Sequence, residues 1–184
     1  MIRLASSSVT RAQLLKEAGI EFFQESVGFD EDSIIASSPK NFVYQAALGK
    51  YEANLRTFGF KDYPLLVADT VVTSANKILR KAKSIDEARD ILLTQSGNLT
   101  SIITCMIYQS TEMKLIDISA TDYNFEEFNI DDLESYLNSG EWQGKAGACM
   151  VEGFCKPYIK EVRGFESTAM GINTEILQAL IINK

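Results

Sequence analysis

The sequence contains no histidine at all and only three cysteines among its 184 residues. Without histidine, neither a Ser-His or Cys-His catalytic pair nor a histidine metal ligand can form. The cysteines form no CxxC pair and are odd in number, so we expect reduced thiols, with neither a disulfide framework nor a structural zinc site. Any hydrolytic chemistry must therefore use carboxylates, lysine or arginine, hydroxyls and a metal bound through oxygen.

An excess of positive charge and long apolar runs are also missing. Acidic residues outnumber basic residues by 25 to 18, and the net charge of -7 argues against non-specific nucleic-acid binding. No apolar stretch reaches the roughly 18 residues that a membrane span needs. The first residues, Met1–Ser6, lack the apolar region of a secretory signal. We therefore expect no nucleic acid partner, no membrane association and a cytoplasmic location.

Apolar residues make up 46% of the chain, which at this length is enough for a substantial core. No repeat or linker divides the sequence, so we expect a single domain over residues 1–184, in one body or two lobes. Helical patterns cover residues 11–18, 39–56, 84–95, 131–137 and 173–182, and strand-like patterns cover 20–23, 64–72, 78–79, 99–109, 114–124 and 158–162. This succession predicts an α/β fold with a mixed sheet and flanking helices.

Two segments in the first half of the chain carry the candidate chemistry. Small hydroxyl residues and an arginine, Ser6–Arg11, precede an apolar helical pattern, where free N–H groups and the helix dipole attract an anion. Asp69 directly follows the apolar run Leu65–Ala68, and a carboxylate buried there is costly unless it is paired or used. Together the two segments predict that a phosphate ester and a carboxylate meet in one site.

Each of these residues also has a purely structural interpretation when it is taken singly. Ser6–Ser8 is most often a helix cap, and the cations Arg11, Lys50 and Lys81 are usually solvated. Glu31 lies in an acidic stretch that is typical of a surface loop. Asp69 is the exception, because its two interpretations are about equally well supported by its position alone.

Three ordered motifs resemble the signatures of the Maf family. Leu4–Leu15 is similar to the opening of that family, Ala68–Val72 to its central aspartate motif, and Gly144–Ala148 to its third signature. The resemblance spans essentially the whole chain. It implies an α/β structure of the Maf and inosine triphosphatase type, with two lobes around a central cleft, and usually a homodimer. The implied activity is a nucleoside triphosphate pyrophosphatase, which releases a nucleoside monophosphate and pyrophosphate.

The resemblance also implies roles for particular residues. Asp69 would act as the proton acceptor with Glu31 beside it, and both would hold Mg²⁺ or Mn²⁺, which carboxylates bind well. The phosphates would be bound by Ser6, Arg11, Lys50 and Lys81. The base would be selected by Thr10, Thr70 and Glu152. Cations that hold phosphate oxygens beside metal-binding carboxylates are the groups that triphosphate hydrolysis needs.

Departures from the family pattern leave the preferred base open. Thr10 stands where many members carry an arginine that is associated with substrate choice. Thr70 matches the branch that prefers dTTP and UTP, whereas the segment around Glu152 is nearer to the branch that hydrolyses 7-methyl-GTP. An alternative function is a non-catalytic nucleotide-binding regulator of cell division. The chain keeps both Asp69 and Glu31, which favours the enzyme.

Overall fold

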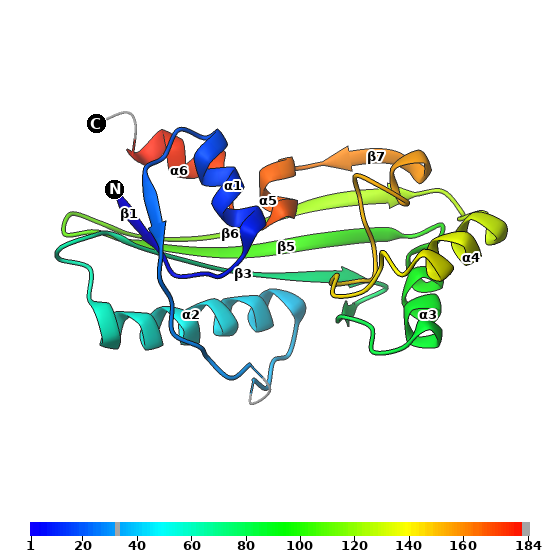
Figure 1. Ribbon diagram of the computed structural model, residues 1–184, viewed down its shortest axis with the longest axis horizontal. Helices are drawn as coiled ribbons and strands as arrows, with labels where there is room; N and C mark the ends of the chain where they lie inside the picture. The colour runs from blue at the N-terminus through cyan, green and yellow to red at the C-terminus, as the bar shows by residue number, and fades with distance from the viewer. Residues whose placement is uncertain (32–33, 182–184) are drawn as a thin grey trace. The chain divides into compact units, whose positions relative to one another are not determined.

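The computed structural model describes residues 1–31 and 34–181 (Figure 1). The helices are α1 (Val9–Glu17), α2 (Pro39–Phe58), α3 (Ile85–Gln95), α4 (Ile130–Ser139), α5 (Glu166–Met170) and α6 (Thr174–Ile181). The strands are β1 (Ile2–Leu4), β2 (Phe22–Gln24), β3 (Leu65–Ser74), β4 (Lys77–Leu79), β5 (Leu99–Gln109), β6 (Lys114–Phe125) and β7 (Ile159–Arg163). Within the described residues, no helix is long and apolar enough to cross a membrane.

The strands form one seven-stranded sheet in the order β2-β1-β3-β5-β6-β7, with β4 paired to β3. β1 runs parallel to both β2 and β3, as crossover connections through helices allow. β4 runs antiparallel to β3, and β7 antiparallel to β6. The predicted α/β fold with a mixed sheet and flanking helices is therefore confirmed.

The chain divides into two compact units. Unit 1 contains Met1–Thr70, Ile103–Ala120 and the described residues from Phe165 onward, and unit 2 contains Val71–Ile102 and Thr121–Gly164. Each of β3, β5 and β6 contributes residues to both units. Two units agree with the expected two lobes, whereas the central cleft and the single domain over residues 1–184 stay predictions.

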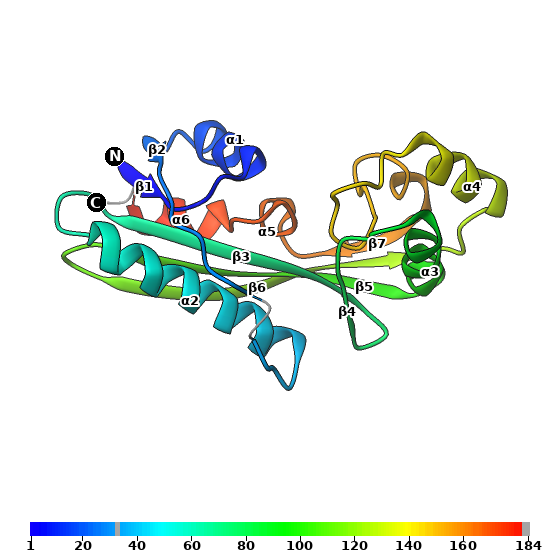
Figure 2. The same cartoon turned by 60° about the horizontal axis from the view of Figure 1, so that its bottom comes forward.

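In unit 1, helices cover both faces of the strands. α1 and α6 lie on one face and α2 on the other, as the two views of Figures 1 and 2 agree. Side chains of β1, α1, β3 and α6 form one buried cluster that includes Leu4, Leu15, Leu66 and Leu177. On the other side, α2 buries a stripe of small and apolar residues at helical spacing, which are Val43, Ala46 and Ala47.

In unit 2, α3 and α4 pack against each other. Their buried side chains include Leu92, Leu133 and Leu137. α3 begins at the predicted cap, because the Ser84 hydroxyl accepts a hydrogen bond of 3.2 Å from the backbone N–H of Glu87. α4 ends at Gly140, whose φ of 74° is a conformation that glycine adopts without strain. Local sequence signals therefore set the start of α3 and the end of α4.

The structure differs from the sequence-based expectation in several short elements. β1 and α5 are not predicted, because three and five residues respectively are too few to show a period. Ile182, the last residue of the predicted terminal helix, lies outside the described residues.

The expectation of three reduced cysteines is wrong. Cys149 and Cys155 form a disulfide, because a turn brings their Cα atoms to 6.4 Å from each other. An odd count and the lack of a CxxC pair do not prevent such a bond between two of three cysteines. Cys105 is free and buried, and burial raises the pKa of its thiol to about 12.

Candidate active site

The candidate site lies in unit 1, where β1 leaves the sheet. β1 pairs with Leu65 and Leu66 of β3, and the chain then turns through Ser6 into α1. Successive side chains of a strand point to opposite faces. Asp69 and Thr70 therefore lie on opposite faces of β3, with Asp69 in contact with α2 and Thr70 in contact with α1.

Two carboxylates converge on one ammonium group. Nζ of Lys50 lies 2.5 Å from Oδ1 of Asp69 and 2.6 Å from Oε1 of Glu31. Lys50 reaches this position because it continues the buried stripe of α2 and is itself half-buried. The structure therefore brings together three of the residues that the sequence singled out, from three separate segments of the chain.

Asp69 is almost fully buried, and this changes its acidity. Burial raises the pKa of the Asp69 carboxyl, while the charge and the hydrogen bond of Lys50 lower it. The charge of Glu31 raises this pKa further, and the charge of Arg11 lowers it. Taken together, these influences raise the pKa of Asp69 above that of an ordinary aspartate. Asp69 therefore takes up a proton more readily than an exposed aspartate does.

Besides its ion pair with Lys50, the segment that carries Glu31 contacts α2 at Asn54 and at Gly49. Oδ1 of Asn54 accepts a hydrogen bond of 2.9 Å from the backbone N–H of Val27. The ring of Phe29 lies directly over Gly49, where an added Cβ would come within 2.2 Å of the ring. Only a glycine leaves room for that ring, so these contacts position Glu31 beside Lys50.

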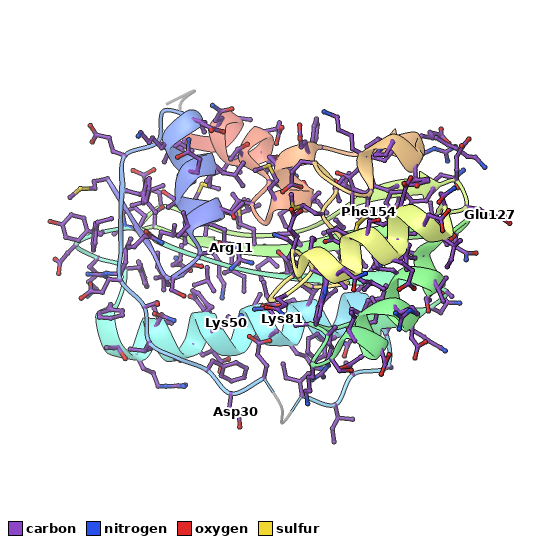
Figure 3. All side chains as sticks on the ribbon, turned by 45° about the vertical axis from the view of Figure 1, so that its right-hand side comes forward. Arg11, Asp30, Lys50, Lys81, Glu127 and Phe154 are labelled. Atoms are coloured by element: carbon purple, nitrogen blue, oxygen red, sulfur yellow. A yellow bond between two sulfur atoms is a disulfide. The ribbon has the colours of Figure 1, made fainter. Side chains whose placement is uncertain are left out.

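Arg11 is the centre of a second group of polar residues. Its Nε donates to the carbonyl of Gly171 at 3.0 Å, Nη2 to Oγ1 of Thr70 at 3.1 Å and Nη1 to Oγ of Ser6 at 3.3 Å. The hydroxyl of Ser8 caps α1 by accepting from the backbone N–H of Arg11 at 3.3 Å. Figure 3 labels Arg11 at the start of α1 and Lys50 on α2.

The two groups of residues interact electrostatically. Burial lowers the pKa of the Arg11 guanidinium, and the negative charges of Asp69 and Glu31 raise it. Two cations and two carboxylates thus lie within interaction range in unit 1. This arrangement suits a ligand that carries both negative oxygens and a bound cation.

The other predicted site residues have different positions. Lys81 is exposed in unit 2, where its backbone forms an antiparallel bridge with Ala146 of the third signature. Glu152 is also exposed in unit 2 and lies inside the loop that the Cys149–Cys155 disulfide closes. Thr10 is exposed in the first turn of α1. The roles of these three residues stay predictions.

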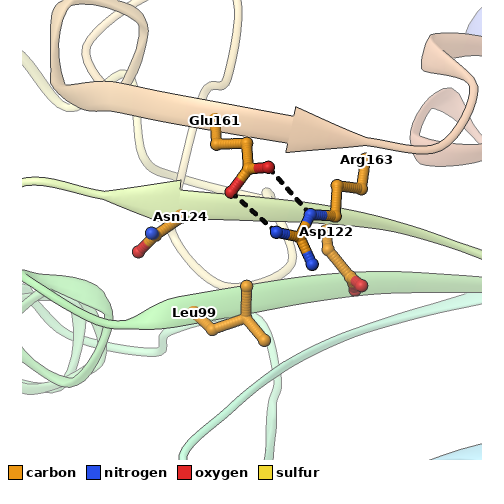
Figure 4. Close-up of a pocket in the computed structure, with 5 residues that line it drawn as sticks. All are labelled: Leu99, Asp122, Asn124, Glu161 and Arg163. Atoms are coloured by element: carbon orange, nitrogen blue, oxygen red, sulfur yellow. Dashed lines mark hydrogen bonds and ion pairs between the residues drawn. The ribbon is translucent and has the colours of Figure 1, made fainter.

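A pocket of about 270 Å³ in unit 2 contains none of the predicted site residues. It is lined by Leu99, Asp122, Asn124, Glu161 and Arg163 (Figure 4). The guanidinium of Arg163 donates to Glu161 at 2.9 and 3.1 Å, so its charge is already balanced. We assign no function to this pocket.

The carboxylates of the site fit a hard divalent cation. Among residues 1–31 and 34–181, no group of three or more His, Cys, Asp or Glu side chains gathers. Mg²⁺ needs fewer protein ligands than that, because it is usually held by one or two carboxylates together with waters and substrate phosphates. Asp69 and Glu31, which already converge on one cation, meet this requirement.

Sequence reasoning missed several residues that build the site. Asn54 is fully buried four positions after Lys50, so the helical spacing could have revealed it. Gly49 inside a predicted helix was a second available signal, because an interior glycine often marks a close contact. Gly171 follows the unpredicted α5, and its φ of 111° lets its backbone approach Arg11. Nothing in the local sequence marks that approach.

Comparisons with known proteins agree over nearly the whole chain. A family model described as Maf-like protein matches residues 1–183. A Nitratiruptor protein named nucleoside triphosphate pyrophosphatase is 55% identical over 179 residues, which is 96% of each chain. Proteins of the same name from Helicobacter pylori and Campylobacter jejuni are 40% and 37% identical, over 94% and 98% of this chain and 90% and 100% of their own.

Proposed function

Because this chain belongs to the Maf-like protein family, we propose that it is a nucleoside triphosphate pyrophosphatase. It would hydrolyse the bond between the α and β phosphates and release a nucleoside monophosphate and pyrophosphate. The relatives described above carry this name. The observation that supports the proposal most directly is the convergence of Asp69 and Glu31 on Lys50, beside Arg11.

Asp69 is the residue best suited to take the proton of the attacking water. Its Oδ1 accepts from Lys50, whereas its Oδ2 accepts no hydrogen bond from the described residues. A water at Oδ2 would give its proton to the carboxylate as its oxygen attacks the α phosphorus. The bond to the bridging oxygen then breaks, and the electron pair leaves with pyrophosphate. Burial of Asp69, which raises the pKa of its carboxyl, favours this transfer.

Mg²⁺ or Mn²⁺ is the cofactor that we propose, with Glu31 and Asp69 as its protein ligands. When bound, such an ion neutralises charge on the phosphate oxygens. Without it, two carboxylates beside a triphosphate would repel the substrate.

The remaining proposed roles concern phosphates, base and assembly. Arg11 and Lys50 supply positive charge to the triphosphate, and the Ser6 hydroxyl supplies a further hydrogen bond. We assign Lys81 to phosphate binding as well, and Thr10, Thr70 and Glu152 to the choice of base. We also propose that the chain forms one Maf-like domain over residues 1–184 and assembles as a homodimer in the cytoplasm.

A non-catalytic nucleotide-binding regulator is the competing function. Such a protein needs cations for the phosphates but gains nothing from a buried carboxylate, because burial of that charge costs free energy and repels the ligand. Lys50 offsets the burial of Asp69, but the carboxylate lies within interaction range of Arg11, the cation that we assign to the phosphates, so its repulsion of a phosphate ligand is present here. The pair of Asp69 and Glu31 therefore favours the enzyme.

Product analysis with a panel of nucleoside triphosphates tests the proposal. The protein is incubated with dTTP, UTP, 7-methyl-GTP and the common nucleotides, with Mg²⁺ or Mn²⁺, and pyrophosphate and orthophosphate are measured separately. We expect equal amounts of pyrophosphate and monophosphate from at least one nucleotide. Release of orthophosphate with a diphosphate would contradict the proposal, and tight binding without any product would support the regulator.

A further inference from the structure

A chain of hydrogen bonds runs from the interior of unit 1 to Arg11. Thr104, on β5, donates from its hydroxyl to the carbonyl of Thr168 in α5 at 2.7 Å. Oγ1 of Thr104 lies 2.9 Å from Oγ1 of Thr70, and Thr70 accepts from Nη2 of Arg11 at 3.1 Å. Thr104 and Thr168 are both completely buried, so Thr104 itself cannot touch a ligand.

The direction of every hydrogen bond in this chain follows from simple counting. A carbonyl oxygen can only accept, so the single proton of the Thr104 hydroxyl is used on Thr168. Thr104 must then accept the hydrogen bond from Thr70, so the Thr70 hydroxyl donates its single proton to Thr104. Thr70 therefore presents a lone pair to Arg11 and has no proton left for a nucleotide base.

The same contacts determine which donors of Arg11 remain. A guanidinium has five N–H bonds. Three of them donate to Gly171, Thr70 and Ser6. One N–H on Nη1 and one on Nη2 are left without a partner among the described residues. These two N–H bonds can donate to phosphate oxygens, and they do so best when the guanidinium is held in one orientation.

We propose that Thr104 is a positioning residue, which through Thr70 holds Arg11 in the orientation that binds the substrate's phosphates. The inference rests on the proposed function and deepens it. It adds the orientation of Arg11 to the part in base choice that we propose for Thr70. The part of the ligand that Arg11 recognises is the polyphosphate chain, independently of the base.

The test measures the binding of inorganic tripolyphosphate, which has no base and needs no catalysis. Thr104→Val removes the hydroxyl and nearly keeps the shape, whereas Thr104→Ser keeps the hydroxyl and removes a methyl group. We expect Kd to rise about tenfold in Thr104→Val and to stay within about twofold in Thr104→Ser, since one oriented hydrogen bond separates the two variants. Equal losses in both variants would overturn the proposal.

A double-mutant cycle with Arg11→Ala separates positioning from a merely structural role. If Thr104 acts through Arg11, Thr104→Val weakens tripolyphosphate binding no further once Arg11 is absent. The same loss in both backgrounds would contradict the proposal. Thr70→Val breaks the same chain of hydrogen bonds from a half-buried position and should give the same coupling. Thermal unfolding shows whether Thr104→Val folds, and Thr70→Val replaces it in the cycle if it does not.

The outcome is independent of the product assay. A wild-type protein that does not bind tripolyphosphate would overturn this inference, even where pyrophosphate is released from nucleotides. A protein that hydrolyses no nucleotide but shows the coupling with Arg11 would keep the inference and remove the pyrophosphatase assignment.

Discussion

Nζ of Lys50 lies 2.5 Å from Oδ1 of Asp69, and the two residues are 19 positions apart in the chain. The pair joins the buried stripe of α2 to the face of β3 that this helix covers. Since Asp69 is almost fully buried, its charge depends on this partner. Removal of one member of such a pair is more damaging than removal of both, because it leaves an uncompensated buried charge.

Asp69→Asn should abolish most of the turnover and leave nucleotide binding largely intact. Asparagine has the same shape but cannot accept the proton of water, and loss of a general base typically lowers kcat by roughly 10²- to 10⁴-fold. Steady-state kinetics and calorimetric binding measure the two effects. Asp122→Asn, which changes a half-buried aspartate of unit 2, is the matched control. Near-normal turnover in a folded Asp69→Asn protein would remove Asp69 from catalysis.

The pKa of Asp69 should respond in opposite directions to its two neighbours. Lys50 lowers this pKa, so Lys50→Met should raise it further above the ordinary value. Glu31 raises it, so Glu31→Gln should lower it. Carbon-13 NMR of the carboxyl group, recorded as a pH titration in EDTA, measures both shifts without a metal. Shifts of the same sign in both variants would show that Asp69 does not interact with both groups.

Gly49→Ala should lower activity although Gly49 touches no substrate. Its new Cβ would overlap the ring of Phe29, whose displacement moves the segment that carries Glu31. We expect kcat to fall roughly tenfold or more, since small misplacements of a catalytic group are costly. A Phe29→Ala protein should lose activity too, and Gly49→Ala should add little to that loss. Additive losses would place the effect of Gly49 elsewhere.

Lys81→Ala should weaken binding according to the number of phosphates. If Lys81 binds the triphosphate, Kd should rise more for a nucleoside triphosphate than for the corresponding monophosphate, because the charge of the ligand is larger. Lys83→Ala changes another exposed lysine of the same segment and should leave both constants unchanged. Titration calorimetry with the two nucleotides compares the variants. An equal loss for both ligands would show that Lys81 does not bind the phosphate chain.

Glu152→Gln should shift the preferred base. A carboxylate only accepts hydrogen bonds and suits the N–H donors of a guanine edge, whereas an amide matches a uracil or thymine edge. We expect relative kcat/KM to move from 7-methyl-GTP toward dTTP and UTP, by about the 1–3 kcal/mol that one bidentate contact discriminates. If the wild type already prefers dTTP or UTP and the ratio does not change, Glu152 does not read the base.

Much of the fold could be predicted from local sequence. The strand at Leu99–Gln109 has its predicted bounds, and α3 begins at its predicted cap, Ser84. Periodicity and capping are properties of neighbouring residues, so they survive folding unchanged. β1 and α5 were missed because elements this short form through contacts with distant segments.

The sequence by itself determined the α/β class, and its resemblance to the Maf family singled out Ser6, Arg11, Glu31, Lys50 and Asp69 as candidate site residues. Only the tertiary structure decided that Lys50 bridges Asp69 and Glu31. It also decided that Thr70 and Gly171 accept hydrogen bonds from Arg11 and that two of the cysteines are bonded. A local sequence pattern indicates which secondary structure one segment favours. A hydrogen bond between residues far apart in the chain depends instead on how packing places both backbones.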